Sequence, residues 1–145
     1  MQHRYARVLL VEDNPADALL AAELINETGI RANITTVNDG ELAITTLEEM
    51  WKSESDSPDL ILLDINLPKK NGHEVLRFIR TAHIAKAYVA IYTGSSSPED
   101  KRNAEEHGAD AYIIKPIGPV EMDRTVEMLR KILGSKLEAS THVDK

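Results

Sequence analysis

The chain has 145 residues, a length that suits one folded domain built around a single hydrophobic core. Apolar residues make up 42% and charged residues 28%, as in ordinary soluble proteins, and the net charge of −7 argues against a nucleic-acid partner. The lack of cysteine excludes disulfides, thiolate metal sites and cysteine nucleophiles. No apolar segment approaches the roughly 18 residues of a membrane span, and the polar start is no signal peptide. We therefore expect a cytoplasmic protein without membrane contact.

Short apolar runs alternate with segments of helical spacing along the chain. The predicted strands are residues 8–11, 33–37, 60–63, 88–93 and 111–114. The predicted helices are residues 14–29, 42–50, 74–82, 97–108 and 119–133. Residues 1–134 are predicted to form the domain, and residues 135–145 a poorly ordered tail.

Capping and turn residues support these boundaries. Asn14-Pro15 and Ser97-Pro98 each combine a helix cap with a first-turn proline, and Gly29 ends the first helix. Residues 60–63 form a continuous apolar run, as expected for a strand buried in the centre of a parallel sheet. Lys115-Pro116 follows the fifth strand, and a cis peptide there could direct the lysine into a pocket.

Five strands alternating with five helices predict an α/β fold, a doubly wound parallel sheet. The flavodoxin-like strand order 2-1-3-4-5 is the common choice for five strands, although pattern alone does not establish the order. In that order the first and third strands are neighbours, so Glu12, Asp13 and Asp64 end at the same edge of the sheet.

For each of these carboxylates taken alone, an acidic turn residue is as good an explanation as a functional one. Three of them close together repel one another unless a cation intervenes, and oxygen ligands favour a hard divalent ion such as Mg²⁺. Thr93 and Lys115 end the fourth and fifth strands and add a hydroxyl donor and an ammonium. Such a site could hold a phosphoryl group on Asp64, which would act as the nucleophile.

With these residues in view, the sequence resembles the receiver domains of two-component response regulators, over roughly residues 7–133. The resemblance is carried by Leu10-Val11-Glu12-Asp13-Asn14, Asp59-Leu60-Ile61-Leu62-Leu63-Asp64, Leu67-Pro68, Gly72, Thr93-Gly94-Ser95 and Tyr112-Ile113-Ile114-Lys115-Pro116. The sequence from Asp64 to Gly72 looks most like that of single-domain regulators paired with phytochrome-type kinases.

The resemblance implies a role for each site residue. Asp64 would be phosphorylated from the phosphohistidine of a sensor histidine kinase, and Lys115 would clamp the phosphoryl group. Asp13, Asp64 and the main-chain carbonyl of Asn66 would bind Mg²⁺, with Glu12 acting through water. Thr93 would be the switch hydroxyl and Tyr112 the switch aromatic residue, which rotates inward when Thr93 moves.

The resemblance also favours a homodimer through the face formed by the fourth helix, the fifth strand and the fifth helix. On a helical wheel, Met128 and Ile132 lie beside the core stripe of the last helix and Val120 lies on its far side. Some apolar surface is therefore expected to remain exposed there.

Two alternatives stay open from the residues alone, a phosphorylation-independent adaptor and a Mg²⁺-dependent aspartyl-phosphate phosphatase. The phosphatase chemistry needs a second aspartate two residues after the nucleophile, where this chain has Asn66, and an amide cannot transfer that proton. A flavin-binding flavodoxin is disfavoured because Glu12-Asp13 would repel the cofactor's phosphate. The five histidines show no ligand spacing and are predicted to be surface residues.

Overall fold

A computed structural model describes residues 5–53, 57–82 and 87–143 of the chain. Its strands are β1 (Ala6–Val11), β2 (Ala32–Val37), β3 (Leu60–Leu63), β4 (Tyr88–Thr93) and β5 (Ala111–Ile114). Its helices are α1 (Pro15–Glu27), α2 (Gly40–Trp51), α3 (Gly72–Thr81), α4 (Pro98–Glu106) and α5 (Pro119–Val143). All ten predicted elements are present. Residues 54–56, between α2 and β3, lie outside the described part.

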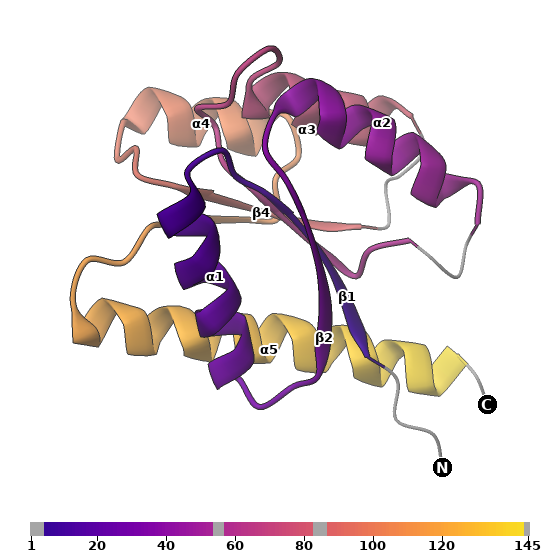
Figure 1. Cartoon of the computed structure of the whole chain (residues 1–145), viewed down its shortest axis with the longest axis vertical. Coiled ribbons are helices and arrows are strands. Elements are labelled where there is room, and N and C mark those ends of the chain that lie inside the picture. Colours follow the sequence, from indigo (N-terminus) through magenta and orange to yellow (C-terminus); the bar gives the residue numbers. More distant parts are fainter. Residues whose placement is uncertain (1–4, 54–56, 83–86, 144–145) are drawn as a thin grey trace.

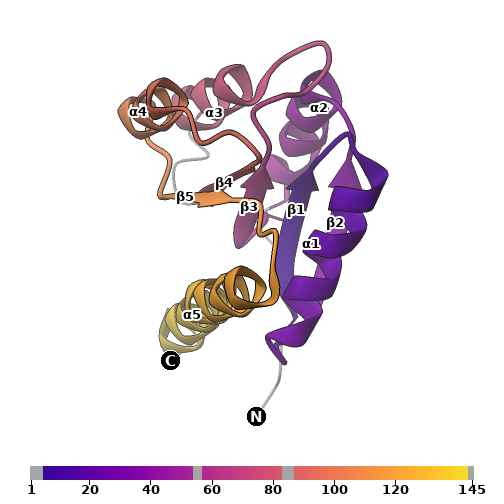
Figure 2. The ribbon, with the colours of Figure 1, turned by 90° about the vertical axis from the view of Figure 1, so that its left-hand side faces the viewer.

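The five strands form one parallel sheet in the order β2-β1-β3-β4-β5, which confirms the flavodoxin-like prediction. Helices α2, α3 and α4 cover one face of this sheet, and α1 and α5 cover the other (Figures 1 and 2). Because the strands are parallel, all five carboxyl ends lie at one edge, where open α/β sheets place their ligands.

Each face of the sheet has its own hydrophobic core. Leu9, Ile61 and Ile91 point toward α2, α3 and α4, where they pack with apolar residues of those helices. The alternate strand residues, such as Leu10 and Leu62, pack against α1 and α5. Residues of β3 are buried on both faces, which explains why this strand is a continuous apolar run.

Side chains at the carboxyl edge fix where three helices begin. The side chains of Asn14, Asp39 and Asn71 accept hydrogen bonds from the main chain of the first turns of α1, α2 and α3. Glu74 completes a capping box with Asn71. Helices α1 and α2 begin within four residues of the ends of β1 and β2, whereas a longer loop, residues 64–71, separates β3 from α3.

The chain's path differs from one sequence prediction and does not use one possibility that the sequence left open. The peptide between Lys115 and Pro116, where a cis bond was possible, is trans, since the described residues contain no cis peptide. Helix α5 does not end near Leu133 but continues to Val143, so residues 135–143 of the predicted tail are helical. Its apolar stripe explains the difference, because Leu137 packs against the same core as Leu129 and Leu133. Residues 144–145 lie outside the described part.

Candidate functional site

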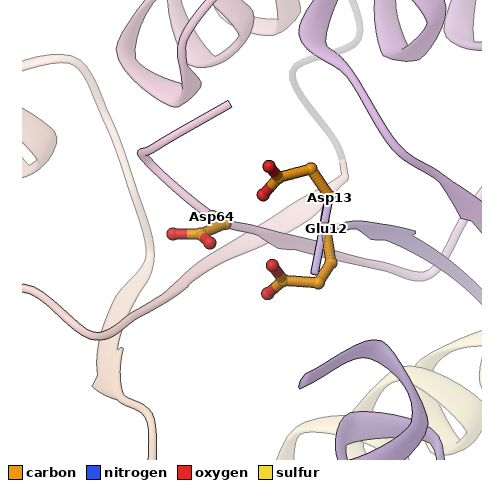
Figure 3. A group of neighbouring side chains, drawn as sticks. All are labelled: Glu12, Asp13 and Asp64. Carbon is orange, nitrogen blue, oxygen red and sulfur yellow. The ribbon is translucent and has the colours of Figure 1, made fainter. Parts of the chain in front are cut away.

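Three carboxylates meet at the carboxyl ends of β1 and β3. Val11 and Leu63 are partners in the sheet, so the residues that follow them, Glu12 and Asp64, leave the two strands side by side. Carboxylate oxygens of Glu12, Asp13 and Asp64 all lie within 4.8 Å of one another (Figure 3). Glu12 and Asp64 are buried, whereas Asp13 is exposed. The predicted convergence of the three acidic side chains is therefore present.

Asp64 is held by both oxygens of its carboxylate. Oδ1 accepts hydrogen bonds from the main-chain amides of Ile65, at 2.7 Å, and Asn66, at 3.4 Å. Oδ2 accepts a hydrogen bond from the Lys115 ammonium at 2.9 Å. The residue is 5% exposed, so its charge lies in a largely desolvated site whose donors have fixed positions.

Lys115 is the cation of this site and contacts three carboxylates at once. Its Nζ lies 2.8 Å from Glu12 Oε1, 2.9 Å from Asp17 Oδ2 and 2.9 Å from Asp64 Oδ2. Burial works against the charged ammonium, but the contacts with these carboxylates outweigh it and hold the pKa of Lys115 above its ordinary value. Lys115 therefore stays protonated in this setting and offsets part of the negative charge.

Asp17 belongs to this site although it is not among the residues that the sequence predicts for it. It lies in the first turn of α1, and its main-chain amide is bonded by the cap residue Asn14. A signal was available, because an acidic residue in the first turn of a helix that starts directly after Glu12-Asp13 must lie near the same sheet edge.

Glu12 has one carboxylate oxygen that is buried without a well-formed hydrogen bond. Its Oε2 accepts a hydrogen bond from the Asn14 amide at 3.1 Å. Its buried Oε1 is at ion-pair distance from Lys115 but accepts no hydrogen bond of good geometry from any described residue. Burial, with a further contribution from the charge of Asp64, raises the pKa of the Glu12 carboxyl. An underused buried oxygen among three carboxylates suits a hard divalent ion such as Mg²⁺.

Thr93 and Tyr112 are linked through the loop after β4. Thr93 is fully buried at the end of β4, and its hydroxyl oxygen accepts a hydrogen bond from the Ser95 amide at 3.3 Å. The hydroxyl proton of Thr93 is left to donate elsewhere. Tyr112 is half-buried and donates its hydroxyl proton to the Ser95 carbonyl at 2.9 Å. The two predicted switch residues thus contact the same residue.

Position 72 requires glycine because there is no room for a side chain, and not because of its backbone conformation. A Cβ there would lie 2.2 Å from the main-chain oxygen of Asp64 and 2.7 Å from Cα of Ile65. The Gly72 amide also donates to the Ile65 carbonyl at 2.8 Å. The start of α3 is therefore packed directly onto the backbone of Asp64.

His73 follows Gly72 and contradicts the prediction that the histidines lie on the surface. Its side chain is 12% exposed, and Nε2 lies 3.3 Å from Asp100 Oδ1 in the first turn of α4. The other oxygen of Asp100 accepts a hydrogen bond from the Ser95 hydroxyl at 2.6 Å, which lowers the pKa of Asp100. His107 is half-buried. His3 and His83, with the side chain of His142, lie outside the described part.

Tyr92 forms part of the floor of the site on the α1 and α5 side of the sheet. Its ring centroid lies 5.9 Å from the Lys115 ammonium, within cation–π range. Its buried hydroxyl has no hydrogen-bond partner among the described residues. Burial raises the pKa of Tyr92 to about 12. Its sequence context predicts only a strand residue.

The structure thus brings Glu12, Asp13, Asp64 and Lys115 into one group. Thr93 ends the strand next to β3. Asn66 is exposed in the loop after β3, and its amide reaches Asp64. No described helix has both the length and the apolar run that a membrane span needs.

Comparison with known proteins gives consistent relatives. Residues 8–127 match the family model of the response regulator receiver domain. The probable methanogenesis regulatory protein FilR2 of Methanothrix harundinacea is 35% identical over 125 residues, which cover 86% of this chain and 81% of FilR2. Response regulator Rcp1 of Synechocystis sp. is 36% identical over 110 residues, 74% of this chain and 75% of Rcp1. The chain spans about half the length of the transcriptional regulators CiaR and CpxR, which it also matches.

Two solved structures share the fold over most of their length. The phosphorylated cyanobacterial phytochrome response regulator RcpA has a TM-score of 0.73 and 30% identity, over 89% of this chain and 91% of that one. The Mn²⁺-bound form of response regulator Rcp1 has a TM-score of 0.71 and 32% identity, over 88% and 91% of the two chains. With the family model matching most of the sequence, this chain belongs to the response regulator receiver domain family of two-component systems.

Proposed function

We propose that this chain accepts a phosphoryl group on Asp64 from a histidine kinase and signals through protein contacts that depend on that group. The observation that carries the proposal is the buried Asp64 carboxylate bonded to Lys115 beside two further carboxylates. In the transfer, an Asp64 oxygen attacks phosphorus, the new P–O bond forms and the P–N bond to the kinase's imidazole breaks. The departing nitrogen keeps the bonding electron pair, which yields a neutral imidazole after proton exchange.

The residues at the sheet edge fit a divalent cation, which we propose to be Mg²⁺. Asp13, Asp64 and the main-chain carbonyl of Asn66 would hold it, with Glu12 acting through water. When bound, the ion supplies positive charge against the phosphoryl oxygens. Lys115 supplies a second positive charge, and the Thr93 hydroxyl donates a hydrogen bond to a phosphoryl oxygen. The Mn²⁺-bound form of the relative Rcp1 supports a divalent ion in this fold.

Radiolabelled acetyl phosphate with Mg²⁺ tests the chemistry without a kinase. We expect a stable, hydroxylamine-sensitive label on the wild type and none on Asp64→Asn. Asp123→Asn removes an exposed carboxylate on α5 and should label like the wild type. Rapid release of phosphate over many turnovers would instead identify a phosphatase. If the protein is correctly folded but takes up no label, the remaining function is that of a phosphorylation-independent adaptor.

A groove beside Asp13 supports a docking position for the kinase, which by its relatives would be of the phytochrome type. The groove has a volume of about 550 Å³ and lies between α1 and α2, next to the acceptor edge. Leu19 and Leu42 line it and are 64% and 44% exposed. We expect Leu19→Glu to slow phosphotransfer from a kinase but to leave labelling by acetyl phosphate unchanged. Equal effects on both reactions would reject docking at this groove.

The output face is proposed to be the surface of α4, β5 and α5, through which a homodimer would form. Ile114, Val120 and Met128 are exposed there by 49%, 60% and 41%. Ile132 is partly buried against the core, so a charge at that position would disturb folding as well as association. Sedimentation should therefore compare the wild type with Val120→Glu and Met128→Glu, and Leu19→Glu is the control on another face. Self-association that persists in both variants would reject this face.

A further inference from the structure

We propose that Asp17 is a positioning residue, which holds the Lys115 ammonium beside Asp64 where a phosphoryl group would form. This inference rests on the proposed function, since it concerns the cation that this group would meet. Asp17 lies in the first turn of α1 and not at a strand end, where Asp64 and Lys115 lie. It acts through Lys115 and needs no contact with the phosphoryl group.

The backbone of Lys115 is fixed by the sheet, but its ammonium is not. The Lys115 amide donates to the Thr93 carbonyl at 2.8 Å, which continues the pairing of β5 with β4. This bond fixes where the side chain begins. The ammonium lies at the far end of a flexible carbon chain, and holding it in one place costs rotamer entropy. Its position therefore depends on the groups that bind it.

Two directed hydrogen bonds hold the ammonium. Lys115 Nζ donates to Asp64 Oδ2 and to Asp17 Oδ2, both at 2.9 Å. Glu12 Oε1 lies at 2.8 Å but accepts no hydrogen bond of good geometry from any described residue. An ammonium has three protons, so the bond to Asp17 does not compete with the bond to Asp64. Asp17 is therefore a second anchor, separate from the acceptor itself.

The acceptor changes chemically in the proposed reaction, whereas Asp17 does not. When Asp64 takes up a phosphoryl group, one of its oxygens enters the new P–O bond and the negative charge lies on the phosphoryl oxygens. Asp17 keeps its charge, and its backbone stays fixed because its amide donates to the Asn14 side chain at 3.0 Å. A cation that is already in place when charge develops needs no reorganisation at that moment. Asp17 supplies that fixed reference point.

The exposure of Asp17 makes it a suitable position for a test. Its side chain is 38% exposed, against 1% for Glu12 and 6% for Asp64, the other two carboxylates that Lys115 contacts. Truncation of Asp17 therefore leaves no buried cavity. The ring of Tyr92 still lies 5.9 Å from the ammonium on another side. A change seen in an Asp17 variant then reports the position of Lys115 and not a loss of folding.

Lysine ammonium signals in ¹H–¹⁵N spectra report whether Lys115 is held. An ammonium with fixed hydrogen bonds and little contact with water exchanges its protons slowly and gives a signal, which Lys115→Arg assigns by removing it. We expect this signal in the wild type and in Asp17→Asn, whose amide oxygen can still accept the bond. We expect its loss in Asp17→Ala. Glu41→Ala is the matched control and should keep the signal, because it removes an exposed acidic residue from the first turn of α2.

Labelling by acetyl phosphate with Mg²⁺ in excess measures the consequence for the proposed chemistry. We expect the initial rate per folded molecule to fall about fivefold in Asp17→Ala and to stay within about twofold of the wild type in Asp17→Asn and Glu41→Ala. Both Asp17 variants remove the same negative charge. The difference between them therefore measures the hydrogen bond to Lys115 and not the repulsion between carboxylates and phosphate.

The two measurements separate this inference from the proposed function. An ammonium signal that persists in Asp17→Ala, or that is missing from the wild type, would show that Asp17 does not hold Lys115. Equal labelling rates in Asp17→Ala and Asp17→Asn would also overturn the inference. Normal labelling of the wild type with an unchanged rate in Asp17→Ala would refute the role of Asp17 alone. A wild type that takes up no label would refute the proposed function, and the role of Asp17 toward a phosphoryl group with it.

Discussion

Replacing Gly72 with alanine would test how the acceptor residue is held in place. The added Cβ would lie 2.2 Å from the main-chain oxygen of Asp64, and ordinary contacts begin at 3.4 Å. The two backbone segments must therefore separate by about 1.2 Å, and the close packing of the interior resists this. Overpacking of this size against rigid backbone costs about 3 kcal/mol of unfolding free energy.

Urea denaturation measures that loss, and labelling by acetyl phosphate measures the effect on chemistry. We expect Gly72→Ala to label at least about tenfold more slowly per folded molecule, because Asp64 is displaced from Lys115. Gly134→Ala is the matched control, because nothing lies within 4 Å of its added Cβ inside α5. It should gain about 0.7 kcal/mol from helix propensity and label normally. Wild-type stability together with wild-type labelling in Gly72→Ala would refute the reasoning.

Three further predictions concern Lys115, Tyr92 and Arg80. Lys115→Met should lower the unfolding free energy, measured by urea denaturation, by about 3 kcal/mol, because Glu12 and Asp64 stay buried without their counter-charge. Added Mg²⁺ should restore part of the lost unfolding free energy. Tyr92→Phe should leave stability unchanged or raise it by about 1 kcal/mol, since the hydroxyl is buried without a described partner. The pKa of Tyr92 is raised from 10.0 to about 12 in the folded protein. The stability that this pKa difference contributes is therefore fully present below the pKa of the unfolded chain, and it is lost as the pH rises through the pKa of the folded one. In an alkaline titration followed by phenolate absorbance, the component that ionises at the highest pH should be missing from Tyr92→Phe. Arg80→Ala should cost about 2 kcal/mol in urea unfolding, since the guanidinium donates to the Ala87 and Gly108 carbonyls and to Asp110, yet labelling should be unchanged.

Each of these outcomes has a clear opposite. A Lys115→Met protein as stable as the wild type without Mg²⁺ would mean that the acidic residues do not need this ammonium. An unchanged alkaline titration in Tyr92→Phe would assign the high pKa to another tyrosine. Slower labelling in Arg80→Ala, at the edge opposite the acceptor, would show that the two edges of the sheet are coupled.

The elements and the acidic edge were predictable because local signals and the global fold agree. The apolar run of residues 60–63 predicts a buried central strand, and a parallel sheet then places Glu12 beside Asp64. The convergence of charge follows from topology alone, without knowledge of any side-chain angle. Residue roles at this edge stay predictions until the labelling experiments are done.

The parts that were missed depend on contacts that no local pattern carries. His73 looks like any polar residue on a helix, and only the approach of α4 gives it a carboxylate partner, Asp100. The end of α5 was misplaced because Gly134 resembles a stop signal, whereas Leu137 extends the core contact past it. Tyr92 differs from other strand residues only in that the Lys115 ammonium lies over its ring, and no local sequence pattern indicates this contact.

The contacts of Lys115 join segments that are far apart in the sequence. It is separated from Asp17 by 98 positions and from Asp64 by 51. Pairings between such distant segments form late in folding, after the loops between them have closed. A nascent or partly folded chain that lacks β5 has the acidic residues but no ammonium between them. On the proposed function, such a chain would lack the ammonium that Lys115 supplies to a phosphoryl group on Asp64.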